Sequence, residues 1–347
     1  MGQPALVYLD HNVLDLMTKG DPDRVAQLLT QASVTTVFSD ETLAEIRRST
    51  GYERTFLELL EQLRARHLVP VLDKEFKHTG NAEVRLISPF DAYSNYIANV
   101  DSMPELGFGL AGILQKFYGG RQDQSFAEIL AGGATELRAL LEKLNAELAD
   151  IPNVDDQSRV AIAEAVASIP RMLEEQSGRM AAQLDADPEA AVRRFEGATG
   201  LGPKALKNIE RPNVVRKVWE LVQPSLRGAE IDMETFFGIT PSPWEVDAGR
   251  ERTTLGKVNA IYHQLNFLGY YRDSNMSRRR RFNASFSDMT HAGLASFCDV
   301  LISRDEDLVM KAAAAYEYLS VGTQILHYGN HRPEPTPNLP QNQVAPK

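Results

Sequence analysis

The sequence predicts an α/β fold in which a central parallel sheet is interrupted by a large all-α insertion. Strand-like and helix-like segments alternate over residues 1–75 and again over residues 285–330. Over residues 76–284, in contrast, apolar side chains recur almost only at helical spacing. Alternating strands and helices with short connections form parallel sheets. We therefore expect one α/β domain built from the two flanks, 1–75 and 285–330, with a helical insertion between them.

The N-terminal flank contains two strand–helix pairs. Ala5–Leu9 is a short buried-strand run, and Asp21–Ala32 carries apolar residues at helical spacing. Val34–Phe38 is β-branched and aromatic, which favours a second strand. Ser39 then supplies N-cap chemistry for a helix, and a longer amphipathic helix follows at 53–66.

The C-terminal flank repeats this alternation. Ser287 is expected to cap a helix, which is followed by a strand at Val300–Ser303. A helix at 308–319 and a final strand at Val321–Leu326 complete the pattern. The remaining segment, 331–347, is rich in proline and poor in apolar residues, so we expect it to be disordered.

The insertion is predicted to be helical on two grounds. Apolar residues recur at helical spacing in the stretches 123–148, 155–179 and 211–223. Asp187-Pro188 and Arg211-Pro212 are favourable helix starts, because proline is well tolerated in the first turn. The insertion could select a substrate, mediate homo-oligomerisation or bind a regulatory protein, and the sequence does not choose among these roles.

Composition and charge restrict the class of protein. The single cysteine, Cys298, excludes an intramolecular disulfide and a multi-cysteine zinc site, and is typical of the reducing cytoplasm. The N-terminus lacks the basic segment of a signal peptide, and no apolar run approaches the roughly 18 residues needed to span a bilayer. We therefore expect a cytoplasmic protein without a membrane partner. The net charge of −10 argues against a protein that coats nucleic acid, but not against an enzyme that binds a strand through one local patch.

Four acidic residues are expected at one edge of the predicted sheet. Asp10 follows the first strand, and Asp305 comes two residues after the strand that ends at Ser303. Asp288 opens the expected late helix, and Glu45 lies about one turn into the helix after the second strand. Sites in open parallel sheets form at the carboxyl ends of the strands, so these side chains should converge. Because like charges raise each other's pKa, four carboxylates ionise together only around a cation, for which Mg²⁺ or Mn²⁺ is suited.

Each of these acids also has a structural interpretation. Asp10 could cap a strand end, and Asp288 could stabilise a helix dipole. Glu45 could pair with Arg48, and Asp305 could cap the following helix. It is their joint placement at one sheet edge that favours a metal site.

The segments that carry these acids resemble the PIN-domain nucleases. They read LVYLDHNVL, SDETLAEIRR and SDMTHAGLASFCDVLISRDEDL. The resemblance implies a three-layer α/β/α domain in which an acidic cluster binds Mg²⁺ or Mn²⁺ and cleaves RNA, less often DNA. It covers the two flanks only and does not extend to the helical insertion. The run Asp288-x-x-His291 followed by Cys298-Asp299 resembles a PIN-like subgroup with long insertions.

The resemblance also assigns roles to individual residues. Its four metal-binding and catalytic acids correspond to Asp10, Glu45, Asp288 and Asp305.

Three further residues are expected to support these acids. Asn12 stands where the family has a small polar residue beside the first acid, and Ser303 where it usually has threonine. His291, one helical turn after Asp288, could orient that carboxylate, contact substrate or be purely structural. Asp299 is expected at the opposite edge of the sheet, in a structural role.

A run of four arginines precedes the expected late helix: Arg278, Arg279, Arg280 and Arg281. Guanidinium groups bind phosphates bidentately, and such a patch would offset the repulsion between an acidic pocket and a polyanion. The alternative is a solvated or ion-paired loop. With the family resemblance, the run suggests a nucleic-acid substrate, RNA in preference to DNA.

Two other classes of function stay open. A phosphohydrolase of the haloacid-dehalogenase type also begins with an aspartate at a strand end, but it needs a second aspartate two positions later, where this chain has Asn12. A catalytically silent PIN-like scaffold or nucleic-acid binder is the third class. The presence of all four acids argues against it.

Overall fold

The computed structural model describes residues 4–20, 32–74, 77–102, 108–149, 191–226, 230–241 and 249–328, with scattered positions at 25–29 and 160–184. The expected tail at 331–347, the helix start at Asp187 and most of the expected helix 155–179 lie outside the described residues. No helix of the described part is long and apolar enough to cross a membrane.

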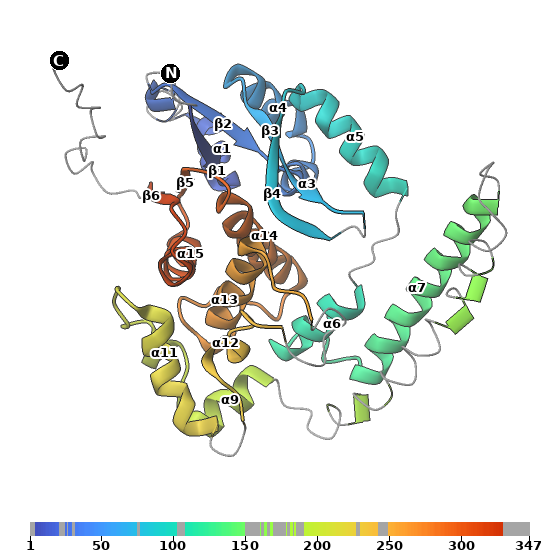
Figure 1. Ribbon diagram of the computed structural model, residues 1–347, viewed down its shortest axis with the longest axis vertical. Coiled ribbons are helices and arrows are strands. Elements are labelled where there is room, and N and C mark those ends of the chain that lie inside the picture. Colours follow the sequence, from blue (N-terminus) through green and yellow to red (C-terminus); the bar gives the residue numbers. More distant parts are fainter. Residues whose placement is uncertain are drawn as a thin grey trace.

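The described strands form one six-stranded sheet, whose spatial order is β4-β3-β2-β1-β5-β6 (Figure 1). Every neighbouring pair is parallel except β3 and β4, which are antiparallel. The predicted α/β class with a largely parallel central sheet is thus confirmed. The strands are β1 (Ala5–Leu9), β2 (Val34–Phe38), β3 (Arg66–Leu72), β4 (His78–Arg85), β5 (Val300–Ser303) and β6 (Gln324–His327).

Helices connect these strands and make up most of the middle of the chain (Figure 1). In the N-terminal part they are α1 (His11–Lys19), α3 (Asp40–Arg48), α4 (Glu53–Gln62) and α5 (Pro89–Ser102). In the middle they are α6 (Phe108–Phe117), α7 (Phe126–Ala149), α9 (Ala191–Thr199), α10 (Pro203–Leu206), α11 (Val214–Val222), the 3₁₀ helix η1 (Gln223–Leu226), α12 (Met233–Phe236) and α13 (Thr254–Leu268). The last two are α14 (Arg279–Ala295) and α15 (Glu306–Leu319).

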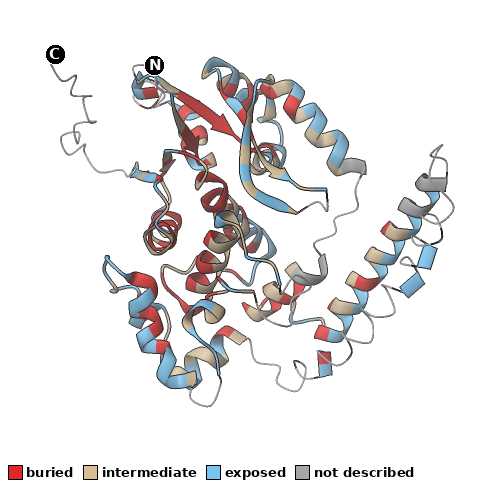
Figure 2. Cartoon of the chain, in the orientation of Figure 1, coloured by how far each residue is buried: buried red, intermediate tan, exposed pale blue. Residues whose placement is uncertain are grey.

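Apolar cores lie on both faces of the sheet. Because side chains alternate along a strand, Val7 and Leu9 of β1 join the cluster with α1, α3 and α4, whereas Tyr8 joins the opposite cluster. That second cluster contains α11, α13, α14 and α15. Buried residues are concentrated in the sheet and in these covering helices (Figure 2). The described part of the chain is therefore a three-layer α/β/α arrangement.

Several expected elements differ in the structure. The helix expected at 53–66 ends at Gln62, strand β3 was not expected, and the final strand expected at Val321–Leu326 is observed at Gln324–His327. Strand β4 lies inside the range 76–284 that was expected to be all helical, and pairs with β3 at the edge of the sheet. Its residues are mostly exposed and polar, so the apolar alternation that marks a strand is missing.

Helix α14 begins at Arg279, and the prediction that Ser287 caps it is wrong. Ser287 is instead buried in the middle of α14, where its hydroxyl donates to Glu41.

The apolar core crosses the boundary predicted at residue 284. Helix α13, within the expected insertion, packs against both α14 and α15. Val258, Ile261 and Leu265 of α13 share one buried cluster with Leu308 and Ala312 of α15. This part of the expected insertion thus completes one face of the α/β layers.

The single cysteine is expected to be unreactive in the folded protein. Cys298 is buried, and burial, aided by the charge of Asp299, raises the pKa of its thiol to about 12. Since the thiolate is the reactive form, modification by a disulfide reagent at pH 8 should be about 10³-fold slower than in the denaturant-unfolded chain. Following thiol release by absorbance tests this, and equal rates in both states would contradict the burial of Cys298.

Candidate metal centre at the sheet switch point

A topological switch point, at which the strand order reverses, lies between β1 and β5. Strands β2 and β3 extend the sheet from one side of β1, and β5 and β6 extend it from the other. Helix α1, which follows β1, and helix α15, which follows β5, contribute to opposite apolar clusters. Ligands of open α/β sheets bind at such a point, outside the carboxyl ends of the strands. Asp10 and Ser303 lie at that edge, where the backbone N–H of Asp10 donates to Ile302 at 3.0 Å.

Asp10 is held by two side-chain hydrogen bonds to the same oxygen. Ser303 Oγ donates to Asp10 Oδ2 at 2.8 Å, and Asn12 Nδ2 donates to it at 3.3 Å. Among the described residues, none forms a hydrogen bond with Oδ1. The supporting positions expected for Asn12 and Ser303 are therefore observed, and they leave one oxygen of a buried carboxylate available to a ligand.

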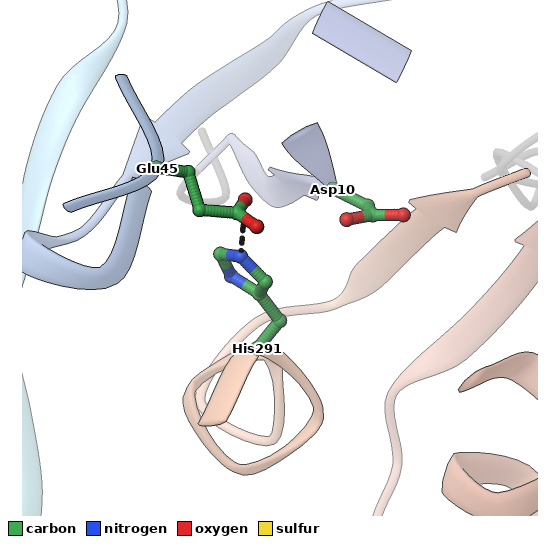
Figure 3. A group of neighbouring side chains, drawn as sticks. All are labelled: Asp10, Glu45 and His291. Carbon is green, nitrogen blue, oxygen red and sulfur yellow. Dashed lines mark hydrogen bonds and ion pairs between the residues drawn. The ribbon is translucent and has the colours of Figure 1, made fainter. Parts of the chain in front are cut away.

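His291 lies between Glu45 and Tyr8, a buried residue of β1, and contacts both through its ring nitrogens. Its Nε2 lies 2.8 Å from Glu45 Oε2 (Figure 3), and its Nδ1 lies 2.7 Å from the hydroxyl of Tyr8. The Tyr8 hydroxyl in turn lies 2.6 Å from Ser39 Oγ. This chain of bonds fixes the ring plane of a fully buried histidine, since both ring nitrogens have partners.

The charges of these three side chains are interdependent. Burial, together with the charges of Glu45 and Asp305, raises the pKa of Asp10, and His291 offsets only part of this. Burial alone would raise the pKa of Glu45, but His291 lowers it below its ordinary value. Burial would also lower the pKa of His291, but Tyr8, Glu45 and Asp10 hold it well above its ordinary value. Positive charge beside the carboxylates of Asp10 and Glu45 is thus electrostatically favourable.

Asp10, Glu45 and His291 satisfy the geometric requirement for a shared ion. One ligand atom from each lies within 4.8 Å of the other two (Figure 3). Two carboxylates and one imidazole fit a divalent cation, and Asp10 Oδ1 forms no hydrogen bond with any described residue. The same atoms can also form a metal-free ion pair.

The other two expected acids lie at the margin of this group. Asp305 caps α15, because its Oδ1 accepts from the backbone N–H of Leu308 at 3.0 Å. Asp288 lies in the middle of α14, and burial with the charges of Asp10, Asp273 and Asp305 raises its pKa well above the ordinary value. Neither belongs to the group whose ligand atoms lie within 4.8 Å of one another in the described part. Asp299, as expected, lies at the amino end of β5, where it accepts from Leu6 N at 2.7 Å.

His11 is a site residue that the sequence analysis missed. It is the first residue of α1, and its Nδ1 lies 3.8 Å from Glu45 Oε2. Its ring packs against Phe56, and burial lowers its pKa. The sequence feature that could have identified His11 is its position directly after Asp10. A side chain that begins the helix after a strand also faces the carboxyl edge of the sheet.

A basic groove adjoins Glu45. It has a volume of about 790 Å³, and its lining residues are His11, Glu45, Arg48, Ser49, Arg279, Arg280, Asn283 and Ala284. Arg279 and Arg280 belong to the first turn of α14, where the helix dipole is positive as well, so this end of the groove attracts anions. Arg278 and Arg281, also expected to bind substrate, are exposed but are not among the lining residues described. Arg48 pairs with Glu41 at 3.2 Å and with Glu45 at 3.6 Å.

The fold and the site define a doubly wound α/β protein with a candidate metal centre at its switch point. No family model, curated protein or solved structure matches the chain. The function is therefore inferred from the chemistry of these side chains and from the motif resemblance.

Proposed function

We propose that the protein is a metal-dependent phosphodiesterase of PIN-like type that hydrolyses nucleic acid, RNA in preference to DNA. The observation that carries this proposal is the convergence of Asp10, Glu45 and His291 at the sheet switch point, beside a groove lined by Arg279 and Arg280. An acidic centre next to a basic groove is the arrangement that a metal-assisted reaction on a polyanion requires.

Each group has a distinct role in this proposal. A divalent ion held by Asp10, Glu45 and His291 would lower the pKa of a bound water and stabilise negative charge on the phosphate. Ser303 and Asn12 orient Asp10, so that one carboxylate oxygen faces the centre. The arginines of the groove bind phosphates that flank the scissile bond.

The proposal is tested by incubating the purified protein with labelled single-stranded RNA, single-stranded DNA and a small phosphomonoester. We expect cleavage of RNA in Mn²⁺ and none in EDTA. Hydrolysis of the phosphomonoester alone would replace the nuclease with a phosphohydrolase. Tight RNA binding without any cleavage would favour a nucleic-acid-binding scaffold.

Replacing Arg280 with alanine is expected to weaken RNA binding about tenfold at low salt, because a charge-assisted contact to phosphate is lost. The slope of log K against log salt concentration should fall by about 0.7, the value for one phosphate contact on a single strand. Binding titrations at several salt concentrations measure both quantities. Arg281→Ala removes the same charge one residue further along α14, outside the described lining of the groove. An equal effect of both variants would show that net charge, rather than the groove, determines binding.

A further inference from the structure

Two histidines each direct one ring nitrogen toward the same carboxylate oxygen. His291 Nε2 lies 2.8 Å from Glu45 Oε2, and His11 Nδ1 lies 3.8 Å from it. These histidines come from different elements, His291 from α14 and His11 from α1. An isolated ion pair with Glu45 needs only one of them.

The second nitrogen of each ring is oriented by a hydroxyl group. Tyr8 Oη lies 2.7 Å from Nδ1 of His291, and Ser49 Oγ lies 3.3 Å from Nε2 of His11. Metal-binding histidines usually have this arrangement, in which an outer partner fixes the ring and leaves the inner nitrogen for the ion.

The inner nitrogen of His11 is a buried polar atom in need of a partner. Among the described residues none forms a hydrogen bond with His11 Nδ1, although the atom is shielded from solvent. A buried nitrogen without a hydrogen bond is unfavourable unless something else satisfies it. Glu45 Oε2 lies 3.8 Å from it, beyond hydrogen-bond distance, and already forms a hydrogen bond with His291.

The separations of the two nitrogens from Glu45 Oε2 are close to those between neighbouring ligands of one ion. Two ligand atoms that each lie about 2.1 Å from one ion are separated by about 3.0–3.4 Å at usual coordination angles. The observed separations from Glu45 Oε2, 2.8 Å and 3.8 Å, bracket that range. His11 lies outside the group whose ligand atoms are all within 4.8 Å of one another, so its ring has to turn toward Asp10 and His291 when the ion is bound.

We propose that His11 is a fourth ligand beside Asp10, Glu45 and His291, and that the centre binds a divalent first-row transition-metal ion in preference to Mg²⁺. Two imidazole nitrogens and two carboxylates form a mixed donor set, whereas Mg²⁺ favours oxygen ligands and retained waters. This departs from the all-carboxylate set that the motif resemblance implies. It rests on the metal centre of the proposed function and is independent of whether that centre cleaves nucleic acid.

The first test measures metal affinity on the full-length, EDTA-treated protein by calorimetry with Mn²⁺ and with Mg²⁺. We expect one Mn²⁺ to bind at least about 100-fold more tightly than Mg²⁺. His11→Ala and His11→Gln should each lower the Mn²⁺ affinity about 10–100-fold and leave the Mg²⁺ affinity nearly unchanged. His78→Ala, at an exposed histidine of β4, is the matched control and should change neither. Circular dichroism confirms that each variant is folded.

The second test counts nitrogen ligands by pulsed electron paramagnetic resonance of the Mn²⁺ complex. We expect ¹⁴N couplings from two imidazoles, and from one in each His11 variant. Unchanged couplings in the His11 variants would overturn this inference and leave the Asp10, Glu45 and His291 centre of the proposed function. Mn²⁺ bound without nitrogen couplings would overturn this inference and also remove His291 from that centre. Absence of any cation binding would overturn both. Nitrogen-coordinated Mn²⁺ in a protein that cleaves neither RNA nor DNA would support this inference and refute the nuclease.

Discussion

Replacing Asp10 with asparagine is expected to reduce the rate of RNA cleavage by about 10³-fold. The carboxylate lies at the carboxyl end of β1 within ligand distance of Glu45 and His291. Removing a charged metal ligand weakens the electrostatic stabilisation of the transition state by several kcal/mol. A loss of about 4 kcal/mol corresponds to a rate decrease of about 10³-fold. Initial rates with labelled RNA in Mn²⁺ measure the effect.

The same substitution is expected to leave the folded protein as stable as before, or more stable. Asparagine retains an oxygen that accepts the hydrogen bonds of Ser303 and Asn12. It also removes a buried negative charge that faces Glu45 and Asp305. The melting temperature of Asp10→Asn without metal should therefore not fall below that of the wild type.

The control for this prediction is Asp299→Asn, at the amino end of β5. It makes the same chemical change, and its amide oxygen can still accept from Leu6 N. We expect it to leave the cleavage rate unchanged. A loss of activity in both variants, or full activity in Asp10→Asn, would remove Asp10 from the proposed centre.

The sequence predicts the fold best where strands are buried. The bounds expected for β1, β2 and β5 agree with those observed, because short apolar runs next to turn or cap residues are characteristic of central parallel strands. Strand β4 was missed because an edge strand carries a polar sequence. The start of α14 was missed because its first two turns carry a single large apolar residue, Phe282, among arginines and small or polar residues, which is too few for an apolar stripe.

In the candidate site, Asp10 and Glu45 lie near each other. This agrees with the expectation that side chains following parallel strands face the same edge of the sheet. That expectation does not settle whether Asp288 or His291 reaches the centre, since both belong to α14 and their positions differ by three. That choice depends on how α14 rotates against the sheet, which is set by tertiary contacts such as the hydrogen bond between Tyr8 and His291. His11 was missed for a similar reason, because its role depends on the direction of the first turn of α1.

Replacing Lys311 with methionine is expected to destabilise the protein by about 3–5 kcal/mol. The ammonium group is fully buried and donates to Asp273 Oδ1 at 2.8 Å, to the carbonyl of Tyr271 at 2.9 Å and to Asn266 Oδ1 at 3.2 Å. Methionine fills a similar volume, but it leaves the carboxylate of Asp273, whose side chain is only 13% exposed, without its cation. Denaturant unfolding of both proteins measures the difference in free energy.

Two further variants separate this effect from the loss of any lysine. Lys311→Met combined with Asp273→Asn should recover part of the lost stability, because the buried pair is then removed rather than broken. Lys19→Met breaks an exposed pair with Asp15 and should cost less than about 1 kcal/mol. A cost for Lys311→Met no larger than that of Lys19→Met would mean that the buried pair contributes little to stability.

The hydrogen bonds of Lys311 also bear on whether the expected helical insertion folds independently of the sheet. Its bonds connect α15, which begins directly after Asp305, to α13 and to the segment that follows α13. The charge of Asp273 also raises the pKa of Asp288, so the ion pair lies within the electrostatic surroundings of the candidate metal centre. If Lys311→Met unfolds in one transition at lower denaturant concentration, α13 and the sheet fold as a unit. Separate transitions would instead restore an independent helical insertion, with its boundary between α13 and α15.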